Sequence, residues 1–243
     1  MLCGCGKAYY TASNYLIRKS DAYIFITEAM REKYQVGDKN SIIIEGLVDV
    51  NENATSNPKK KTNSNKFIVM YTGSIHQIYG IDNLVKAFID ANISDSELHI
   101  YGDGDYRDAL LDICKKHKNV VYYGTVLSSK IVEIQKNASL LVNPRPIEDE
   151  YTKYSFPSKN MEYMVSGTPV LTTDLPGMPK EYKDYVFIME DYSHEGIKNK
   201  LIEIANMDKK KLYEVGIKAR KFVLNKKNNT VQASRIVEMI NSL

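Results

Sequence analysis

The chain is predicted to be an α/β protein with a Rossmann-like parallel sheet of six strands and helices on both faces. Three observations lead to this fold class. After residue 66, short apolar runs alternate regularly with helical patterns, which is typical of parallel sheets. The runs are continuously apolar, as expected for strands that are covered on both faces. With 243 residues, 43% of them hydrophobic, the chain is long enough to bury a sizeable core.

The N-terminal part is expected to form a small α/β unit. Ala22–Thr27 and Ser41–Glu45 are apolar and β-branched, which is typical of short buried strands. Between them, Thr27 is suited to cap a helix over Glu28–Tyr34. Residues 49–66, rich in Asn, Ser and Lys, cannot bury an apolar face and are expected to be a linker. We therefore predict a unit at residues 1–48, a linker at 49–66 and a main domain at 67–243.

The main domain is predicted element by element from its hydrophobic periodicity. Strands are expected at Phe67–Tyr71, Leu98–Tyr101, Val120–Tyr123, Ser139–Asn143, Pro169–Thr172 and Tyr185–Met189. Helices are expected at Ile81–Ala91, Tyr106–His117, Lys130–Lys136, Lys159–Val165, Glu195–Ala205, Lys209–Leu224 and Thr230–Ser242. Ligands of open parallel sheets lie beyond the carboxyl ends of the strands, so a site is expected at the loops that follow the first four strands.

Composition and charge exclude several classes of protein. The net charge of +3 is too small for a typical nucleic-acid-binding domain. The three cysteines argue against a disulfide framework, and Cys3 and Cys5 lack the second pair that a zinc site requires. No run of about 20 apolar residues indicates a membrane span, and the N-terminus lacks the apolar segment of a secretory signal. A reduced, cytoplasmic setting is therefore expected.

Glycines mark the turn after the first strand of the main domain. That strand ends in Thr72-Gly73-Ser74, and Gly80 precedes the next helix. Such glycines allow backbone amides to approach a phosphate near a helix N-terminus, although they equally serve only to make the turn. The chain has neither G-x-G-x-x-G nor G-x-x-x-x-G-K-[ST], so a dinucleotide site and a P-loop are both disfavoured.

An acidic pattern follows the second strand of the main domain. Asp103 and Asp105 form a D-x-D sequence that could bind a metal ion. The glycines at positions 102 and 104 favour a tight turn instead, with Asp105 as the cap of the next helix. The turn is the preferred interpretation, and no metal site is expected.

The stretch most suggestive of chemistry is residues 143–173. Arg145 directly follows an expected strand, and Lys159 lies in the first turn of the helix that starts near Pro157. A lysine at the positive end of a helix is unfavourable unless an anion binds there, and Arg145 offers a bidentate contact to the same anion. Glu162, one turn on, is suited to accept hydrogen bonds from two ribose hydroxyls. The alternative is a surface pair between Lys159 and Glu162 worth roughly 0.3 kcal/mol.

These residues resemble the C-terminal, donor-binding domain of glycosyltransferase family 4, which has the GT-B fold. The resemblance covers about residues 20–243, and its specific part is residues 141–177. The matching motifs occur in the family's order: Tyr71-Thr-Gly-Ser74, Gly80-Ile-Asp, Leu98-His-Ile-Tyr-Gly-Asp-Gly104, Val121-Tyr-Tyr-Gly-Thr-Val126, Leu141-Val-Asn-Pro-Arg-Pro146, Phe156-Pro-Ser-Lys159 and Glu162-Tyr-Met-Val-Ser-Gly-Thr-Pro-Val170.

The resemblance implies hexosyl transfer from a UDP- or GDP-type sugar to a glycan or lipid-linked acceptor, with retention, without a metal and with no cofactor besides the donor. Glu162 matches the glutamate that holds the ribose, whereas Arg145 and Lys159 match basic positions that stabilise the diphosphate. No residue is assigned as the catalytic group. The other implied donor-binding positions are Gly73 and Ser74 in the glycine turn, Gly124, Thr125 and Val126 along the base, and Tyr154, Ser155, Phe156, Pro157 and Ser158 before the helix.

Three departures from the family pattern stand out. The first of the family's two glutamates falls at Tyr154, so the usual carboxylate to the donor sugar is absent; Glu148, Asp149 and Glu150 are candidates to replace it. Ser74 and Tyr79 stand where many members carry Arg and Lys, which leaves the diphosphate to Arg145 and Lys159. Residues 1–48 resemble only a remnant of the N-terminal acceptor domain, which normally supplies a catalytic histidine.

Several functions remain open on this basis. The leading hypothesis is a truncated glycosyltransferase that turns over little by itself. A second is a non-catalytic donor-binding subunit that is completed by a separate N-terminal-half polypeptide, and a third is an inactive fragment. A UDP-sugar epimerase of GT-B architecture is a further alternative. Since many relatives of family 4 use lipid-linked acceptors, peripheral contact at the inner membrane face is compatible with the cytoplasmic setting.

Overall fold

A small parallel sheet lies at the N-terminal end of the chain. The computed structural model describes residues 11–13, 15–17, 19–36, 39–49 and 66–243. Strands β1 (Ala22–Phe25) and β2 (Asn40–Ile43) pair in parallel and are connected by helix α2 (Glu28–Tyr34). Thr27 caps α2 as predicted, since its side chain accepts a hydrogen bond from the amide of Met30 at 3.2 Å. The expected linker lies almost wholly in residues 50–65, outside the described part, as do Cys3 and Cys5.

The predicted six-stranded parallel sheet is confirmed. Its strand order is β5-β4-β3-β6-β7-β8, and all neighbouring strands run parallel. The first strand in sequence is therefore central, the next two extend the sheet to one side, and the last three extend it to the other. The strands are β3 (Phe67–Thr72), β4 (Ser96–Tyr101), β5 (Val120–Gly124), β6 (Leu140–Asn143), β7 (Val170–Thr173) and β8 (Phe187–Met189).

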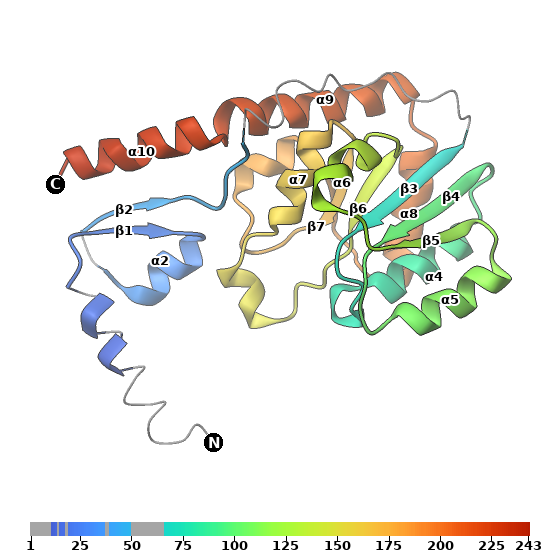
Figure 1. Ribbon diagram of the computed structural model, residues 1–243, viewed down its shortest axis with the longest axis horizontal. Coiled ribbons are helices and arrows are strands. Elements are labelled where there is room, and N and C mark those ends of the chain that lie inside the picture. The colour runs from blue at the N-terminus through green and yellow to red at the C-terminus, as the bar shows by residue number, and fades with distance from the viewer. Residues whose placement is uncertain (1–10, 14, 18, 37–38, 50–65) are drawn as a thin grey trace.

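Helices cover both faces of this sheet (Figure 1). The α-helices of the main domain are α4 (Ile81–Ala91), α5 (Arg107–Lys116), α6 (Ser128–Gln135), α7 (Ser158–Ser166), α8 (His194–Ala205), α9 (Lys209–Lys226) and α10 (Asn229–Asn241). Three short 3₁₀ segments, η1 (Gln77–Tyr79), η2 (Glu150–Tyr154) and η3 (Lys180–Asp184), lie in the connections.

Two hydrophobic cores follow from the alternation of side chains along the strands. On β3, Val69 and Tyr71 point into the core that α4, α5 and α8 cover, whereas Met70 points into the core beneath α7 and α9. Both cores are built from fully buried residues such as Leu98 and Met164. Burial on both faces explains why the strands read as continuously apolar in the sequence.

Helix α10 leaves the main sheet and packs against β2 of the N-terminal unit (Figure 1). Gln232 of α10 donates a hydrogen bond to the carbonyl of Gly46 at 3.1 Å, and Val48 bridges to Asn228. The predicted main domain at residues 67–243 thus includes a helix that also contacts the N-terminal unit. None of the helices in the described residues is both long enough and apolar enough to cross a membrane.

Candidate functional site

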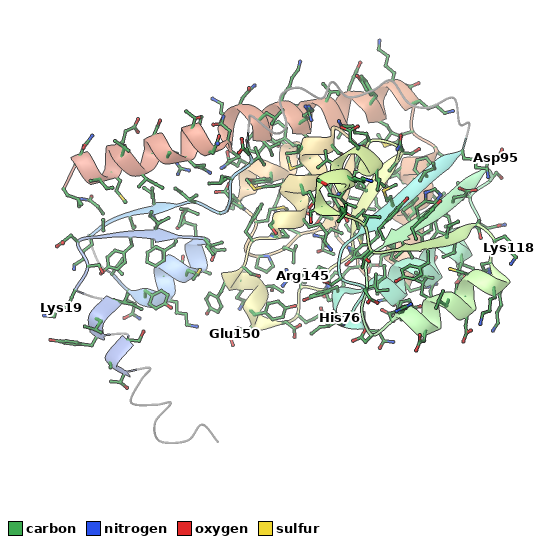
Figure 2. All side chains as sticks on the ribbon, viewed as in Figure 1. Lys19, His76, Asp95, Lys118, Arg145 and Glu150 are labelled. Carbon is green, nitrogen blue, oxygen red and sulfur yellow. The ribbon has the colours of Figure 1, made fainter. Side chains whose placement is uncertain are left out.

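Two adjoining hollows lie at the carboxyl ends of the central strands. Strand β3 is flanked by β4 on one side and β6 on the other: the chain adds β4 and β5 on one side of β3 and then crosses back to β6, so the strand order reverses here. Such a switch point is where open parallel sheets bind their ligands. Figure 2 shows Arg145 and His76 at this edge, opposite Asp95 and Lys118, which precede β4 and β5. The site thus lies at the edge that the predicted topology indicated.

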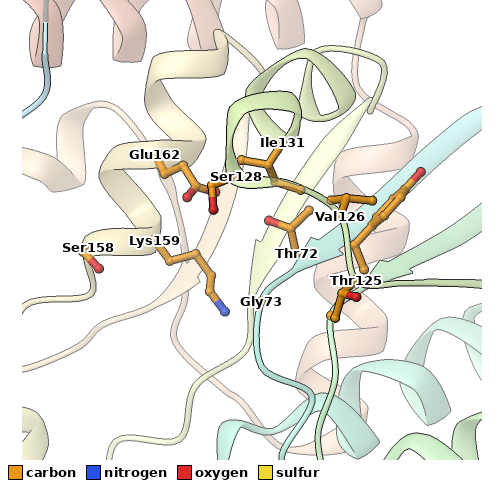
Figure 3. Close-up of a pocket in the computed structure, with 11 residues that line it drawn as sticks. Thr72, Gly73, Thr125, Val126, Ser128, Ile131, Ser158, Lys159 and Glu162 are labelled. Atoms are coloured by element: carbon orange, nitrogen blue, oxygen red, sulfur yellow. The ribbon is translucent and has the colours of Figure 1, made fainter. Parts of the chain in front are cut away.

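The first hollow has a volume of about 370 Å³ and lies between α7 and the loop after β5. In Figure 3, Lys159 and Glu162 extend from α7 toward β3, and Thr125 and Val126 face them from the other side. The full lining consists of Thr72, Gly73, Tyr101, Gly102, Thr125, Val126, Ser128, Ile131, Ser158, Lys159 and Glu162.

The second hollow, of about 310 Å³, shares Gly73, Ser158 and Lys159 with the first. It places Arg145 and Lys159 around one space, which is the arrangement that the sequence predicted for an anion site. Its lining consists of Gly73, Ser74, Tyr79, Asn143, Arg145, Phe156, Pro157, Ser158 and Lys159.

Glycine at two positions keeps the floor of these hollows open. The backbone φ of Gly73 is +139°, and a Cβ there would lie 2.2 Å from the ammonium nitrogen of Lys159. At Gly102, with φ of +137°, a Cβ would lie 1.8 Å from the carbonyl oxygen of Gly73. Only glycine adopts this conformation without strain, so both positions are dictated by backbone geometry as well as by space.

A buried amide network fixes the start of α7 against the sheet. Asn143 at the end of β6 donates to Asn160 Oδ1 at 2.8 Å, and Asn160 donates to Thr172 Oγ1 on β7 at 3.1 Å. All three side chains are buried. Pro157 is the N-cap residue and provides no side-chain cap. The first turn of α7 therefore directs its positive dipole end toward the second hollow, while the amides of Ser158 and Asn160 donate to the carbonyls of Phe156 and Pro157.

Lys159 is held in this first turn by an aromatic contact. Its ammonium donates a hydrogen bond of 3.0 Å to the Tyr71 hydroxyl and lies 4.3 Å from the centre of the Tyr71 ring. Burial lowers the pKa of Lys159 to about 8; the Glu162 carboxylate acts in the opposite direction and Arg145 adds to the decrease. Desolvation is the largest cause of this lowered pKa. An anion that enters the hollow would favour the protonated form of Lys159, because opposite charges attract.

Arg145 lies between two tyrosine rings. The central carbon of its guanidinium is 4.8 Å from the Tyr151 ring centre and 5.7 Å from that of Tyr79. Its carbonyl oxygen accepts a 2.6 Å hydrogen bond from Thr173 Oγ1, and its buried Nε has no protein partner in the described part of the chain. The side chain is thus oriented by stacking, and hydrogen-bond donors remain available to an anion.

Glu162 forms a contact that the sequence analysis did not foresee. Its Oε1 accepts a hydrogen bond of 2.5 Å from Nε2 of Gln135, at the end of α6. The same nitrogen donates to Thr72 Oγ1 at 3.0 Å. The alternative prediction of a surface pair between Lys159 and Glu162 is therefore wrong, because each side chain has a different partner.

Of the predicted site residues, three lie outside the lining of both hollows: Gly124, Tyr154 and Ser155. Gly124 supports the floor, since its carbonyl accepts from the amide of Gly102 at 2.8 Å. The Tyr154 ring lies under the ammonium of Lys33 from α2, at 4.2 Å. The Ser155 hydroxyl is buried without a protein partner among the described residues.

The acidic residues before α7 have partners of their own. Glu148 pairs with the Tyr192 hydroxyl and raises the pKa of that phenol. Asp149 accepts the amide of Thr152 through its carbonyl, and Glu150 lies 3.5 Å from the Tyr154 hydroxyl. None of the three carboxylates lines either hollow. The structure therefore gives no support to the prediction that one of them replaces the missing glutamate.

The predicted turn at residues 102–105 is present, but the predicted helix cap is not. Asp105 accepts a hydrogen bond from the amide of Gln77 at 2.9 Å and lies 3.2 Å from His76 Nδ1. Helix α5 begins after Tyr106, without a side-chain cap. Asp105 thus joins two loops and does not start the helix. Within the described residues, no three potential metal ligands gather into a cluster.

Some lining residues were missed by sequence reasoning. The Tyr101 ring stacks on Tyr123 with 4.6 Å between ring centres, and burial raises the pKa of Tyr101 to about 12. Register places these rings on neighbouring strands, which no single strand's pattern reveals. Thr72, Gly102, Ser128, Ile131 and Asn143 were likewise not predicted as lining residues.

Comparison with known proteins identifies one matching family model. The family model described as "Glycosyl transferases group 1" matches residues 52–222. A search of curated proteins found none that matches this chain.

Three similar solved structures illustrate the fold. A TarM mutant from S. aureus, solved with fondaparinux, alpha-GlcNAc-glycerol and UDP, has a TM-score of 0.72 at 19% identity, over 95% of this chain and 46% of TarM. HepE from Anabaena, solved with UDP and glucose, has a TM-score of 0.72 at 17% identity, over 96% and 66%. Sucrose-phosphate synthase from Thermosynechococcus elongatus has a TM-score of 0.73 at 16% identity, over 100% and 64%. The chain thus spans less than half of TarM and about two thirds of the other two, and at these identities the likeness is one of fold.

Proposed function

Because the chain belongs to group 1 of the glycosyl transferases, we propose that its two hollows bind the nucleotide diphosphate sugar from which a hexosyl group is transferred. The donor is of UDP or GDP type, and the acceptor is a glycan or a lipid-linked glycan. The reaction is of the family-4 kind, retaining and independent of metal. The protein acts in the cytoplasm, with peripheral contact at the inner membrane face where the acceptor is lipid-linked.

One observation carries this proposal: Arg145, Lys159 and Glu162 surround connected hollows at the start of α7. A pyrophosphate carries the negative charge that both cations and the helix N-terminus favour. A ribose offers the hydroxyl donors that a carboxylate accepts. The chemical order along the site is therefore diphosphate near Arg145 and Lys159 and pentose near Glu162, with the base toward Thr125 and Val126.

The same cations have a role in the reaction. When the bond between the sugar and the diphosphate breaks, negative charge develops on the departing phosphate oxygen. Arg145 and Lys159 lie in a partly buried place where fixed positive charge stabilises such an oxygen more strongly than water does. The Ser158 hydroxyl adds a hydrogen-bond donor beside Lys159, and the N-terminal end of the α7 dipole adds positive potential.

These 243 residues are proposed to bind the donor and to turn over slowly by themselves. Transfer between two substrates requires both walls of a cleft, which position the reactants and exclude water. The comparison with TarM, of which this chain spans 46%, supports the proposal, since most of that protein has no counterpart here.

A second function, a non-catalytic donor-binding subunit, is favoured by one feature. Tyr154 replaces a carboxylate and contacts Lys33, and none of the carboxylates of Glu148, Asp149 and Glu150 lines either hollow. Donor binding would then persist without any transfer. Assays of donor consumption, with and without a co-expressed polypeptide that carries the acceptor half, distinguish the two functions.

Titration calorimetry tests the donor site. We expect UDP or GDP to bind more tightly than the corresponding nucleoside. Arg145→Ala and Lys159→Ala should each weaken diphosphate binding by about tenfold or more, one charged hydrogen bond each, and leave nucleoside binding nearly unchanged. Equal losses for both ligands, or no binding of either nucleotide by the wild-type chain, would contradict the proposed function.

A further inference from the structure

Gln135 is a buried polar residue next to the candidate site that lines neither hollow. Its side chain is fully buried, at the C-terminal end of α6. Both of its described side-chain hydrogen bonds start from Nε2, one to Thr72 Oγ1 and one to Glu162 Oε1. Because a side-chain amide nitrogen carries two hydrogens, these two contacts use its whole donor capacity.

The identity of the acceptor fixes how the amide is turned. An ionised carboxylate accepts hydrogen bonds but donates none, so Gln135 faces Glu162 with its nitrogen. Its Oε1 then points elsewhere and has no partner among the described residues. A buried, unsatisfied carbonyl is unfavourable by about 1–3 kcal/mol, so an apolar side chain would suit packing at this position as well. The presence of a glutamine here points to a requirement for its donors.

Further hydrogen bonds fix the backbone of Gln135 and one of its two acceptors. Its own carbonyl accepts a hydrogen bond from Thr168 Oγ1 at 2.9 Å. Thr72 is held in turn, since its amide donates to the Tyr163 hydroxyl at 2.9 Å and its carbonyl accepts from that hydroxyl at 3.0 Å. The side-chain amide therefore lies at a fixed place between β3 and α7.

The result is a carboxylate with one oxygen already fixed. Glu162 lines the first hollow, and its Oε2 has no hydrogen-bond donor in the part of the chain that the structure describes. A free glutamate side chain loses rotamer freedom when it binds a ligand, whereas a side chain that is already held loses less. Pre-orientation thus directs the acceptor capacity of Glu162 into the hollow.

We propose that Gln135 is a positioning residue that holds Glu162 in the orientation required to accept the pentose hydroxyls of the nucleotide donor. This inference rests on the proposed function, because it assigns the ribose of the donor as the ligand of Glu162. It adds a residue from α6, outside the resemblance motifs, whose contribution is selectivity for a ribose with its hydroxyls in place.

The test measures discrimination between a ribonucleotide and its 2′,3′-dideoxy analogue. The probe is UDP or GDP, whichever the wild-type chain binds more tightly in titration calorimetry. Wild type should prefer the ribonucleotide by about tenfold or more, the effect of one charged hydrogen bond. Glu162→Ala should remove the preference, and Gln135→Met, which keeps length but has no donor, should lower it at least threefold.

Gln232→Met is the matched control. Gln232 is also a fully buried helical glutamine, whose Nε2 donates to the Gly46 carbonyl and whose Oε1 accepts from Arg235, but it lies on α10. Its variant should keep the wild-type preference. If Gln135→Met does not fold, Gln135→Asn, shorter by one methylene, serves as the second variant with the same expected loss.

The outcomes separate the two claims. An unchanged preference in the Gln135 variants, or an equal loss of affinity for both nucleotides, overturns the positioning role and leaves the donor site intact. A loss of preference in Gln232→Met also overturns it, because the effect would then be general. If wild type binds neither UDP nor GDP, the proposed function itself fails. A crystal structure of Gln135→Met in which Glu162 keeps its place would independently contradict the inference.

Discussion

Lys159 combines a location that disfavours its charge with a contact that keeps it in place. Burial and the nearby Arg145 lower its pKa to about 8, while the Tyr71 hydroxyl and ring hold the ammonium. A cation at a helix N-terminus is also disfavoured by the helix dipole. A bound anion offsets these unfavourable effects because it stabilises the ammonium of Lys159. The residue is therefore suited to a ligand with negative charge.

This pKa predicts how affinity depends on pH. At pH 7 the free protein carries Lys159 mainly protonated, and the affinity for UDP or GDP should be near its maximum. As pH rises through 8, binding must take up a proton, so the affinity should decrease by about tenfold between pH 7 and pH 9. The diphosphate does not add to this trend, since its last ionisation lies near pH 6.

Titration calorimetry across this range, in buffers of different ionisation enthalpy, measures both the affinity and the proton uptake. Lys159→Arg is the control, because arginine stays charged in proteins and should bind with little dependence on pH. A wild-type affinity that stays constant up to pH 9 would contradict the prediction.

Glu162 gives a second prediction at this scale. Glu162→Ala should weaken nucleotide binding by roughly 1–3 kcal/mol, the contribution of a charged hydrogen-bond acceptor. The loss should be the same for the nucleoside and the diphosphate, because the ribose is common to both. Calorimetry with both ligands checks this, and a loss confined to the diphosphate would place Glu162 at the wrong part of the donor.

The individual site residues were only partly accessible from the sequence. Arg145, Lys159 and Glu162 could be identified because they lie at a strand end and on one face of a helix, both of which periodicity reveals. Gln135 could not, since its contact to Glu162 joins residues that are 27 positions apart. Tyr154 was expected in the site and instead contacts Lys33 on α2, which depends on how the N-terminal unit packs.

At the scale of single elements, the position of α7 against the sheet is set by its C-terminal cap as well as by its first turn. Gly167 is its C-cap residue, with φ of +78°, and its amide bonds back to the carbonyl of Met164 at 3.1 Å. A glycine at a helix C-cap adopts such a left-handed conformation without steric cost. The turn leads directly into β7, so α7 and the sheet share this joint.

Gly167→Val should destabilise the protein by about 1–3 kcal/mol, because a β-branched residue is strained in the left-handed region. Gly167→Asn should lose less, since asparagine tolerates that conformation. Urea unfolding of both variants measures the difference. A valine variant as stable as the asparagine variant would show that the turn relaxes without strain.

Element boundaries were predictable to within about two residues, and the errors have physical causes. Helix α6 begins at Ser128, whereas the sequence predicted a start at Lys130. The start was missed because the first turn of the helix is polar and shows no hydrophobic periodicity. The predicted cap at Asp105 failed because the carboxylate bonds to the amide of Gln77, on a loop distant in sequence. Local rules identify a capping residue type, but tertiary contacts compete for it.

On the scale of the whole molecule, a buried ion pair joins the N-terminal unit to the main domain. Lys227, after α9, lies 2.6 Å from Glu45, which follows β2, and 2.6 Å from Glu181 on η3. The Tyr182 hydroxyl also donates to Glu45 at 2.7 Å. The Glu45 side chain is 1% exposed and that of Lys227 is 7% exposed, so neither charge can rely on water.

Lys227→Met should therefore be strongly destabilising, by about 3–5 kcal/mol, since it leaves the Glu45 carboxylate buried without its cation. Lys183→Met is the control, because its pair with Asp174 is exposed and worth about 0–1 kcal/mol. Denaturant unfolding followed by circular dichroism measures both. A Lys227→Met variant as stable as the control would mean that the two parts are held together by other contacts.

By itself the sequence determined the fold class, all six strands of the main sheet and several of the residues that line the two hollows. These follow from periodicity and from residue chemistry at strand ends, which are local properties of the chain. The tertiary structure decided which side chains meet: Gln135 with Glu162, Lys159 with Tyr71, Tyr154 with Lys33, and Lys227 with Glu45. Hydrogen bonds and ion pairs between distant segments depend on distances of a few ångströms, which only the packed chain sets.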